Sequence, residues 1–515
     1  MIRLSFPFAL PALGIARRLR RTRLPPAVRR LAMRLLPSRL ASAQIFVTPD
    51  LASGLAALEA GEVQKALLHL RPLALQGVAE AEYRMGILCL HGVGLVQDHG
   101  DAAFWLSRAA LQGHGEAESE LGMAYITGSA ALDPDSSLMR WQHIAAQTHD
   151  QVAKANLTLL HPNGLGLERD VPRGLELLKA AASRDVVSAQ LRLGSVYADA
   201  AHGVQDLDAA LFWYRAAAAQ GNVDAQFNLG VLHASGQEAG QDLTAALGWF
   251  RKAAEQGHVV AMFNMGLMHA NAYGCERDMA EAIRWYKKAG DAGEANAQFN
   301  LGLIHANGLA GQHDYAAAIT CFIKAAERGN VSAQFNLGLL YANGIGCPRN
   351  IAEGTIWYRK AATAGSDAAQ VNLGLLYLDR TNPACDAGEA ALWFQRASET
   401  GNALARFNLG TLYAAGNGVP RNDAEAARLF SLAAETGSIG ACIAFARLVV
   451  EGRVAPAERT RAYGWLWRTI EGLDAGGQRD DAHAMLDALA DGMSEADIDQ
   501  AKALAIGALP VPATA

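Results

Sequence analysis

The segment AQFNLG at residues 225–230 decides the fold, because close copies of it recur along the chain every 36 residues. The copies are AMFNMG at 261–266, AQFNLG at 297–302 and 333–338, AQVNLG at 369–374 and ARFNLG at 405–410. A second segment, typified by GWFRKAAEQG at 248–257, keeps the same period half a repeat later. A fixed period of this length indicates stacked copies of one supersecondary unit. Each unit is predicted to be a pair of helices.

The Gly that ends this segment serves as the reference position of the repeat. It recurs in phase as Gly86, Gly122, Gly194, Gly230, Gly266, Gly302, Gly338, Gly374 and Gly410. Thr158 and Ala446 replace it in the third and eleventh repeats. Gly inside a helix costs up to ~1 kcal/mol relative to Ala, so its recurrence predicts a close approach by another helix. Ala stands five residues earlier in all eleven repeats, usually with Leu four residues after it, which marks one apolar helix face.

The second helix of each repeat has its own start and stop signals. Asp or Asn precedes it, as at Asp242 and Asn350, and provides a side-chain N-cap. Gly ends it, as at Gly257, in the left-handed conformation that favours Gly. Eight of the nine Trp residues share one position in this helix, which predicts packing between repeats, with a stacking platform for bases or sugars as the alternative. The third repeat, with Leu177 instead of Trp and an added Gly174, is the weakest copy.

The repeats divide the chain into four parts. We predict an Arg-rich extension over 1–49, an N-terminal capping half-repeat over 50–78, eleven repeats over 79–474, and C-terminal capping helices with a tail over 475–515. Ser494 and Asp497 have the spacing of a capping box and predict the start of the last helix.

Charge is unevenly distributed between the extension and the rest. Ten Arg and no acidic residue precede Asp50, so the remainder has 35 basic against 51 acidic side chains, a net charge of −16. An acidic body lacks the basic face that nucleic acids require, and we predict no nucleic-acid partner. The apolar run at 4–16 is too short to span a bilayer. Most Arg residues of the extension follow this run, whereas the positive charges of a signal peptide precede its apolar segment. The extension is predicted to be a disordered arm or misplaced start, a targeting segment, or a contact with an anionic membrane.

No motif of catalysis or cofactor binding stands apart from the repeat. The sequence has no nucleophile elbow, P-loop, HExxH or dinucleotide fingerprint, so we predict neither an enzyme nor a cofactor. His233, His269 and His305 share a repeat position, but repeats about 10 Å apart cannot bring them to one metal ion. The six Cys form no CxxC and are predicted to be scattered thiols.

Asn differs from these residues because it occupies one position in six consecutive repeats. The six candidate peptide-binding residues are Asn228, Asn264, Asn300, Asn336, Asn372 and Asn408. In the structural alternative, each carboxamide holds the backbone of a neighbouring turn. In the functional alternative, the carboxamides form a ladder facing a groove. Each offers two donors and one acceptor, which suits the backbone of an extended peptide.

The repeat, with Ala-x-Phe-Asn-Leu-Gly, then Asp, Trp-Tyr-x-Lys-Ala-Ala and a final Gly, resembles the Sel1-like repeat, a relative of the tetratricopeptide repeat. The resemblance implies an all-α fold, a right-handed α-solenoid superhelix of 36-residue helix-turn-helix units. It also implies a non-enzymatic scaffold or adaptor for protein partners, in bacterial signalling, envelope or host-interaction processes. The Asn position resembles that of some glycosyltransferase tetratricopeptide superhelices, where Asn lines the concave face and binds peptide backbone.

Cys-rich members of the same family provide the alternative function, an envelope protein that acts on or binds peptidoglycan or β-lactams. Those members carry a Cys pair in nearly every repeat, which this chain lacks. The sequence leaves the compartment open between the cytoplasm, the periplasm and secretion.

Overall fold

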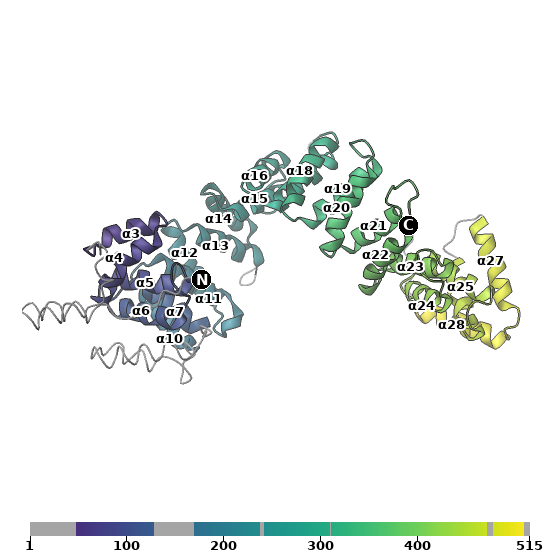
Figure 1. Ribbon diagram of the computed structural model, residues 1–515, viewed down its shortest axis with the longest axis horizontal. Helices are drawn as coiled ribbons and strands as arrows, with labels where there is room; N and C mark the ends of the chain where they lie inside the picture. Colours follow the sequence, from purple (N-terminus) through teal and green to yellow (C-terminus); the bar gives the residue numbers. More distant parts are fainter. Residues whose placement is uncertain (1–47, 128–168, 237–240, 310, 471–476, 509–515) are drawn as a thin grey trace, which may run out of the picture. The chain divides into compact units, whose positions relative to one another are not determined.

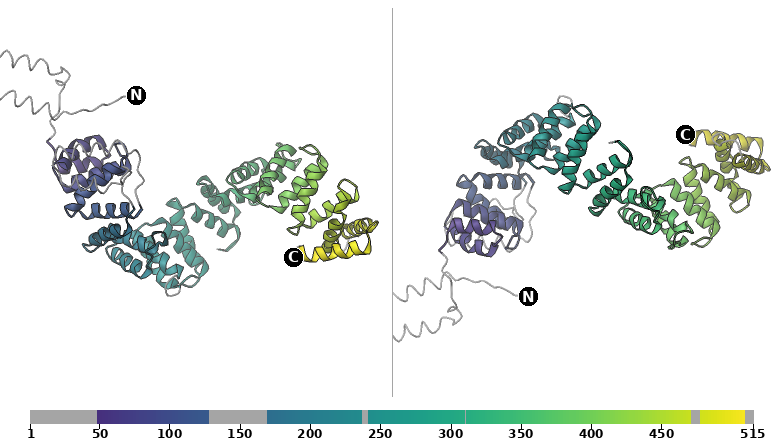
Figure 2. Two further views of the ribbon diagram at one scale, coloured as in Figure 1. Left: turned by 90° about the horizontal axis from the view of Figure 1, so that it is seen from below. Right: turned by 90° about the horizontal axis from the view of Figure 1, so that it is seen from above.

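The computed structural model describes residues 48–127, 169–236, 241–309, 311–470 and 477–508. Every regular element within these ranges is a helix (Figure 1), and two further views show the helices from other directions (Figure 2). The all-α solenoid predicted from the repeat is therefore confirmed. The chain divides into two compact units, Met1–Asp206 and Leu207–Ala515.

The described part of the first unit begins with a helix pair, α3 and α4, in the segment 50–78 that was predicted to be a capping half-repeat. Its helices are α3 (Leu51–Glu59), α4 (Val63–Leu75), α5 (Ala79–His91), α6 (His99–Leu111), α7 (Gly115–Thr127), α10 (Val171–Ala182) and α11 (Val187–Ala198), followed by the 3-10 turn η2 (Ala200–His202). α3 packs on α4, and α4 packs on α5. The first full repeat is thus continuous with the pair that precedes it.

The pairing of α7 with α10 departs from the simple order of repeats. The 36-residue period assigns these helices to the second and third repeats, yet they pack together as closely as the two helices of one repeat. The backbone N–H of Asp170 donates to the carbonyl of Tyr125 at 2.8 Å. A Cβ added at Gly122 would lie 2.9 Å from Cγ of Leu178 and 3.0 Å from the carbonyl oxygen of Gly174. Thr158 lies outside the described residues, and Gly174 is explained by its close approach to α7.

The described residues of the second unit form seven helix pairs. Their first helices are α13 (Val223–Ser235), α15 (Val259–Asn271), α17 (Ala295–Ala306), α19 (Val331–Asn343), α21 (Asp367–Leu378), α23 (Ala403–Ala415) and α25 (Ile439–Val450). Their second helices are α14 (Leu243–Glu255), α16 (Met279–Asp291), α18 (Tyr315–Glu327), α20 (Ile351–Thr363), α22 (Ala387–Glu399), α24 (Asp423–Ala434) and α26 (Arg459–Ile470), with the 3-10 turn η3 (Pro456–Glu458) before the last. α12 (Leu207–Ala219) precedes them.

In six of these seven pairs the reference Gly lies under an aromatic ring of the second helix, and the α25–α26 pair has Ala446 instead. A Cβ at Gly266 would lie 2.5 Å from Cδ1 of Tyr286, and one at Gly230 would lie 2.6 Å from Cδ1 of Phe250. Real Cβ atoms do not approach so closely, so only Gly permits this helix spacing. The close approach predicted from the recurring Gly is confirmed.

Trp and the N-cap residues also behave as predicted. Trp285 of α16 is 6% exposed and packs with Leu247 of α14, in the preceding repeat. Asp242 accepts a hydrogen bond from the backbone N–H of Ala245. Its own N–H donates to the carbonyl of His233 at 3.0 Å. Each Asp or Asn therefore caps the second helix and fastens the preceding loop to the first.

Two further helices, α27 (Gly477–Ala490) and α28 (Glu495–Ala508), pack against α26, and α27 also packs against α25. The backbone N–H of Asp497 donates to the Ser494 hydroxyl, and the N–H of Ser494 donates to the Asp497 carboxylate, both at 3.2 Å. The capping box predicted here is confirmed. None of the described helices has the length and hydropathy that crossing a bilayer requires.

Candidate peptide-binding face

The six Asn predicted to bind peptide all lie on first helices of the second unit, and each is half-buried. We call them the amide strip. The residues four positions before each Asn are exposed, and those three positions after it are exposed or half-buried. Residues with these spacings share one face of a helix. The amide strip therefore runs along the solvent-facing side of the first helices.

Local hydrogen bonds engage part of the amide strip. The Nδ2 groups of Asn336 and Asn408 each donate to a carbonyl one turn earlier in the same helix, those of Ser332 and Leu404, at 2.8 Å. These bonds are the kind that the structural alternative predicts. Each uses one of the two N–H groups of a carboxamide, so the other N–H and the oxygen remain available to a ligand.

Asn300 has a different local partner, the hydroxyl of Tyr286 in the preceding second helix. Burial raises the pKa of Tyr286 to about 12, and the hydrogen bond with Asn300 offsets part of that rise. Within the described residues, the side chains of Asn228, Asn264 and Asn372 have no hydrogen-bond partner in the protein. The strip thus contains both locally bonded carboxamides and carboxamides open to a ligand.

An apolar row accompanies the amide strip, three residues further along each helix. It consists of Val231, Leu267, Leu303, Leu339 and Leu375, with Thr411 at the last position. Val231 is 41% exposed and Leu375 is 40% exposed. Leu267, Leu303 and Leu339 are half-buried and pack against the core. Carboxamides beside partly exposed apolar side chains can, in chemical terms, form hydrogen bonds with a peptide backbone and apolar contacts with its side chains.

The same repeat position is different in the first unit. Arg84 forms an ion pair with Glu80 of its own helix, with 2.6 Å between Nε and Oε1. Arg192 of α11 forms an ion pair with Glu120 of α7, with 2.5 Å between Nη2 and Oε1. Asn156 lies outside the described residues. The described part of the first unit therefore pairs charges where the second unit displays carboxamides.

The His position shared by several repeats has a structural task. The carbonyl oxygens of His233, His269 and His305 accept the N–H groups of the N-cap residues that start the next helices. The ring of His269 is buried, with Nδ1 3.6 Å from Sγ of Cys275. No cluster of His, Cys, Asp or Glu within the described ranges has the geometry of a metal site.

Sequence reasoning missed the role of Gln at the position between the invariant Ala and Phe. Gln334 and Gln370 are buried, and their Nε2 groups donate to the carbonyls of Ala326 and Ala362 at 3.2 Å. Each bond joins a first helix to the last turn of the preceding second helix. The signal was the recurrence of a polar residue on the apolar face.

Sequence reasoning also missed a pocket of about 430 Å³ between α23 and α25, where the amide strip ends. Its walls include Phe407 and Thr411 of α23, and Ile443, Ala444 and Arg447 of α25. Ala444 stands at the position that Asn occupies in the six preceding repeats. The small side chain leaves the space open.

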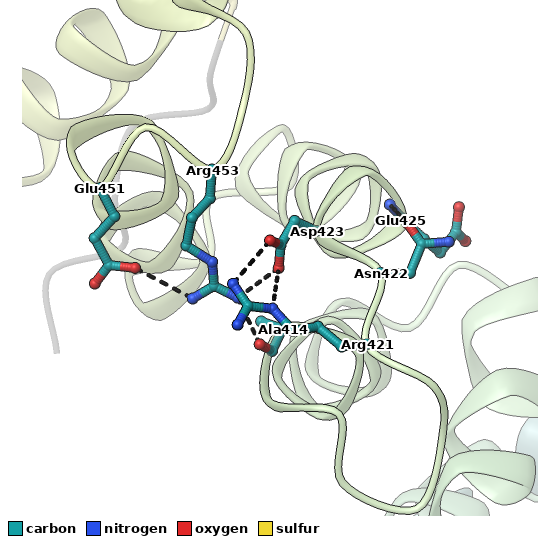
Figure 3. Close-up of polar contacts among 7 residues, drawn as sticks. All are labelled: Ala414, Arg421, Asn422, Asp423, Glu425, Glu451 and Arg453. Carbon is teal, nitrogen blue, oxygen red and sulfur yellow. Dashed lines mark hydrogen bonds and ion pairs between the residues drawn. The ribbon is translucent and has the colours of Figure 1, made fainter.

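One wall of this pocket is fixed by Arg453, which follows α25 (Figure 3). Its Nη2 donates to the Ala414 carbonyl and to Oδ1 of Asp423, both at 2.5 Å, and its Nη1 lies 3.1 Å from Oε2 of Glu451. Arg421 binds the other oxygen of Asp423 at 3.0 Å. Hydrogen bonds from Arg453 and Arg421 hold the pKa of Asp423 well below its ordinary value. The cluster joins the segment after α25 to α23, through Ala414, and to the first residue of α24, Asp423.

Comparison with known proteins agrees with this architecture. The Sel1 repeat matches residues 79–114, 153–186, 187–222, 223–258, 259–294, 295–330, 331–366, 367–402 and 403–438. No curated protein matches the chain. Sel1 repeats, like tetratricopeptide repeats, generally mediate protein–protein interaction, and their solenoid is typically a non-catalytic scaffold.

Two solved structures are similar over most of their lengths. One is a protective antigen present in uropathogenic Escherichia coli strains and displaying an SLR fold, which is 27% identical. The match covers 85% of this chain and 93% of the antigen, with a TM-score of 0.53. The other is a Sel1 repeat protein from Oxalobacter formigenes, 28% identical, with coverage of 67% and 90% and a TM-score of 0.50.

Proposed function

We propose that this chain, which belongs to the Sel1 repeat family, is an adaptor whose amide strip binds an extended peptide segment of a partner protein. The observation that carries the proposal is the placement of all six Asn on the solvent-facing side of consecutive first helices. Asn is a mediocre helix former, and solvent exposure alone would be met equally well by Lys, Glu or Gln. Its repetition here is explained by a ligand that needs carboxamides.

The spacing of the repeats suits an extended chain. Neighbouring helices pack about 10 Å apart, which equals about three residues of extended peptide at ~3.3 Å each. A carboxamide can donate to a peptide carbonyl and accept from a peptide N–H, so each Asn can engage one backbone group without reading side chains. The adjacent apolar row supplies the side-chain contacts that a strictly polar groove would lack.

The test replaces three central members of the strip together, Asn264, Asn300 and Asn336, each by Ala. Peptides of about 16 residues, long enough to cover the five intervals between six Asn residues at about three residues per interval, are selected on the wild-type protein from two randomised libraries. One library presents free amino ends and the other free carboxyl ends. Calorimetric titration should show binding weakened by about 1.5–4.5 kcal/mol in the variant, because each of the three lost hydrogen bonds contributes ~0.5–1.5 kcal/mol.

A matched control changes Asn271, Asn307 and Asn343 to Ala. These exposed residues terminate or follow the same three helices, seven positions beyond the strip, or about 10 Å along the axis. The control should leave affinity unchanged. If the strip variant melts at a lower temperature yet binds like wild type, the six Asn serve the fold and the proposal is wrong.

A further inference from the structure

The pocket between α23 and α25 lies where the amide strip stops. Gly440 and Ala444 replace the larger Leu404 and Asn408 that occupy the same positions one repeat earlier. The space that these small residues leave is lined by apolar side chains, among them Phe407, Phe430, Ile443 and Leu448. A peptide passing along the strip toward its last member therefore reaches a pocket instead of another carboxamide.

Arg447 gives this pocket one uncommitted positive charge. It stands in the row that holds Val231, Leu267, Leu303, Leu339, Leu375 and Thr411 in the earlier repeats, so it is the one charged residue in that row of the second unit. Its side chain is exposed and lines the pocket. Within the described residues, its guanidinium forms no ion pair with a carboxylate.

The other charges of the pocket wall are already paired. Glu451 is held by Arg453, and Arg453 is held in turn by Asp423 and the carbonyl of Ala414 (Figure 3). The charge of Glu451 is therefore neutralised by Arg453, which is held in place by Asp423. The charge left for a ligand is that of Arg447, which calls for one carboxylate.

We propose that this pocket binds the carboxyl-terminal residue of the peptide, with the terminal carboxylate on Arg447 and an apolar side chain among Phe407, Ile443 and Leu448. The inference rests on the proposed function and adds the direction of the peptide, whose carboxyl end lies at α25. The end of a peptide fits this pocket because no backbone continues beyond it. No further carboxamide is then needed, and Ala444 provides none. Guanidinium–carboxylate hydrogen bonds are about twice as strong as neutral ones.

The experiment uses the peptides selected from the library with free carboxyl ends, synthesised both as acids and as carboxyl-terminal amides. On the full-length wild-type protein, the amides should bind about tenfold more weakly than the acids, equivalent to ~1.4 kcal/mol. Arg447→Gln should reduce the affinity of the acids to that of the amides and leave the amides unaffected. Arg380→Gln removes the same charge from an exposed loop position and should preserve the difference between acid and amide.

The outcomes separate the pocket from the strip. Peptides that need the central Asn residues but bind equally as acid and amide would overturn the pocket and leave the proposed function standing. An internal Asp or Glu that depends on Arg447, with an indifferent carboxyl end, would also overturn it. If neither library yields a peptide that depends on the central Asn residues, the proposed function fails and the pocket assignment fails with it.

Discussion

Replacing Gly338 by Ala tests whether the contact between Gly and an aromatic ring sets the spacing of the two helices in each repeat. A Cβ at Gly338 would lie 2.5 Å from Cδ1, 2.7 Å from Cγ and 2.8 Å from Cε1 of Tyr358. The ring is 3% exposed and packs against Phe335, with 5.6 Å between ring centroids. Because three ring atoms are too close at once, a small rotation of Tyr358 cannot relieve the overlap, and the helices must move apart.

Two opposing terms decide the magnitude. Ala is favoured over Gly in a helix by about 0.8–1 kcal/mol, whereas an extra methyl group in a packed core costs typically 1–3 kcal/mol. We expect a net local destabilisation of about 1–2 kcal/mol, since the ring is enclosed. Gly248 of α14 provides the matched control, because it is exposed and an added Cβ would meet no atom within 4 Å. Gly248→Ala should stabilise α14 by up to ~1 kcal/mol.

Hydrogen exchange read by mass spectrometry is the suitable assay, because solenoid stability is a sum of repeat and nearest-neighbour terms and the effects stay local. Amides of α19 and α20 should exchange about 5–30-fold faster in Gly338→Ala, as 1–2 kcal/mol requires. Amides of α14 should exchange more slowly in Gly248→Ala. If both substitutions slow exchange, helix propensity outweighs the contact, and our account of the recurring Gly is wrong.

Two further predictions concern the pairing of α7 with α10 and the ion pair between Arg453 and Asp423. Joining Thr127 to Arg169 by a short Gly–Ser linker should leave the melting midpoint within about 2 °C of wild type, because α7 and α10 pair directly; a large loss of helical circular dichroism would contradict this. The pKa of Asp423 is lower in the folded protein than its ordinary value of 3.8. The ionised carboxylate therefore stabilises the folded state at pH values above 3.8, and this stabilisation is lost as the pH falls below that value. Thermal melts between about pH 5 and pH 3 should therefore show a smaller acid-induced drop in Arg453→Gln than in wild type, and equal drops would exclude the cluster as a source of acid sensitivity.

The sequence was sufficient to predict the helix pairs and their contacts because each depends on short-range chemistry repeated in phase. Asp242 caps the helix that follows it, and Gly266 marks a close approach whatever its partner is. The partner itself is a different matter. A period of 36 residues assigns α7 to the second repeat and α10 to the third. When a first helix pairs with the second helix of the following repeat, the two differ from a normal pair by one full period, so every residue keeps its position in the repeat. The direct pairing of these helices is therefore invisible to periodicity and follows from three-dimensional contact.

The candidate site shows the same division. Helical spacing placed the Asn residues on one face, because a face is a local property of one helix. The pocket between α23 and α25 depends on two small residues, Gly440 and Ala444, facing apolar side chains from another helix. Neither residue is unusual in a helix of a solenoid, so the sequence carries no separate signal for the cavity. Arg447 was the detectable departure, since it interrupts a row of apolar residues.

The repeat position of the amide strip, which we propose binds peptide, carries different side chains in the two units of the chain. At this position in the first unit, Arg192 of α11 forms an ion pair with Glu120 of α7, so its charge is neutralised within the protein. The carboxamides of the second unit carry no charge to neutralise, and those of Asn228, Asn264 and Asn372 lack a partner among the described residues. A neutral surface with free hydrogen-bond donors and acceptors can bind a peptide backbone without repelling peptide side chains that are positively or negatively charged. In the binding mode that we propose, selectivity comes from places where a charge is left unpaired, and Arg447, at the end of the strip, is such a place.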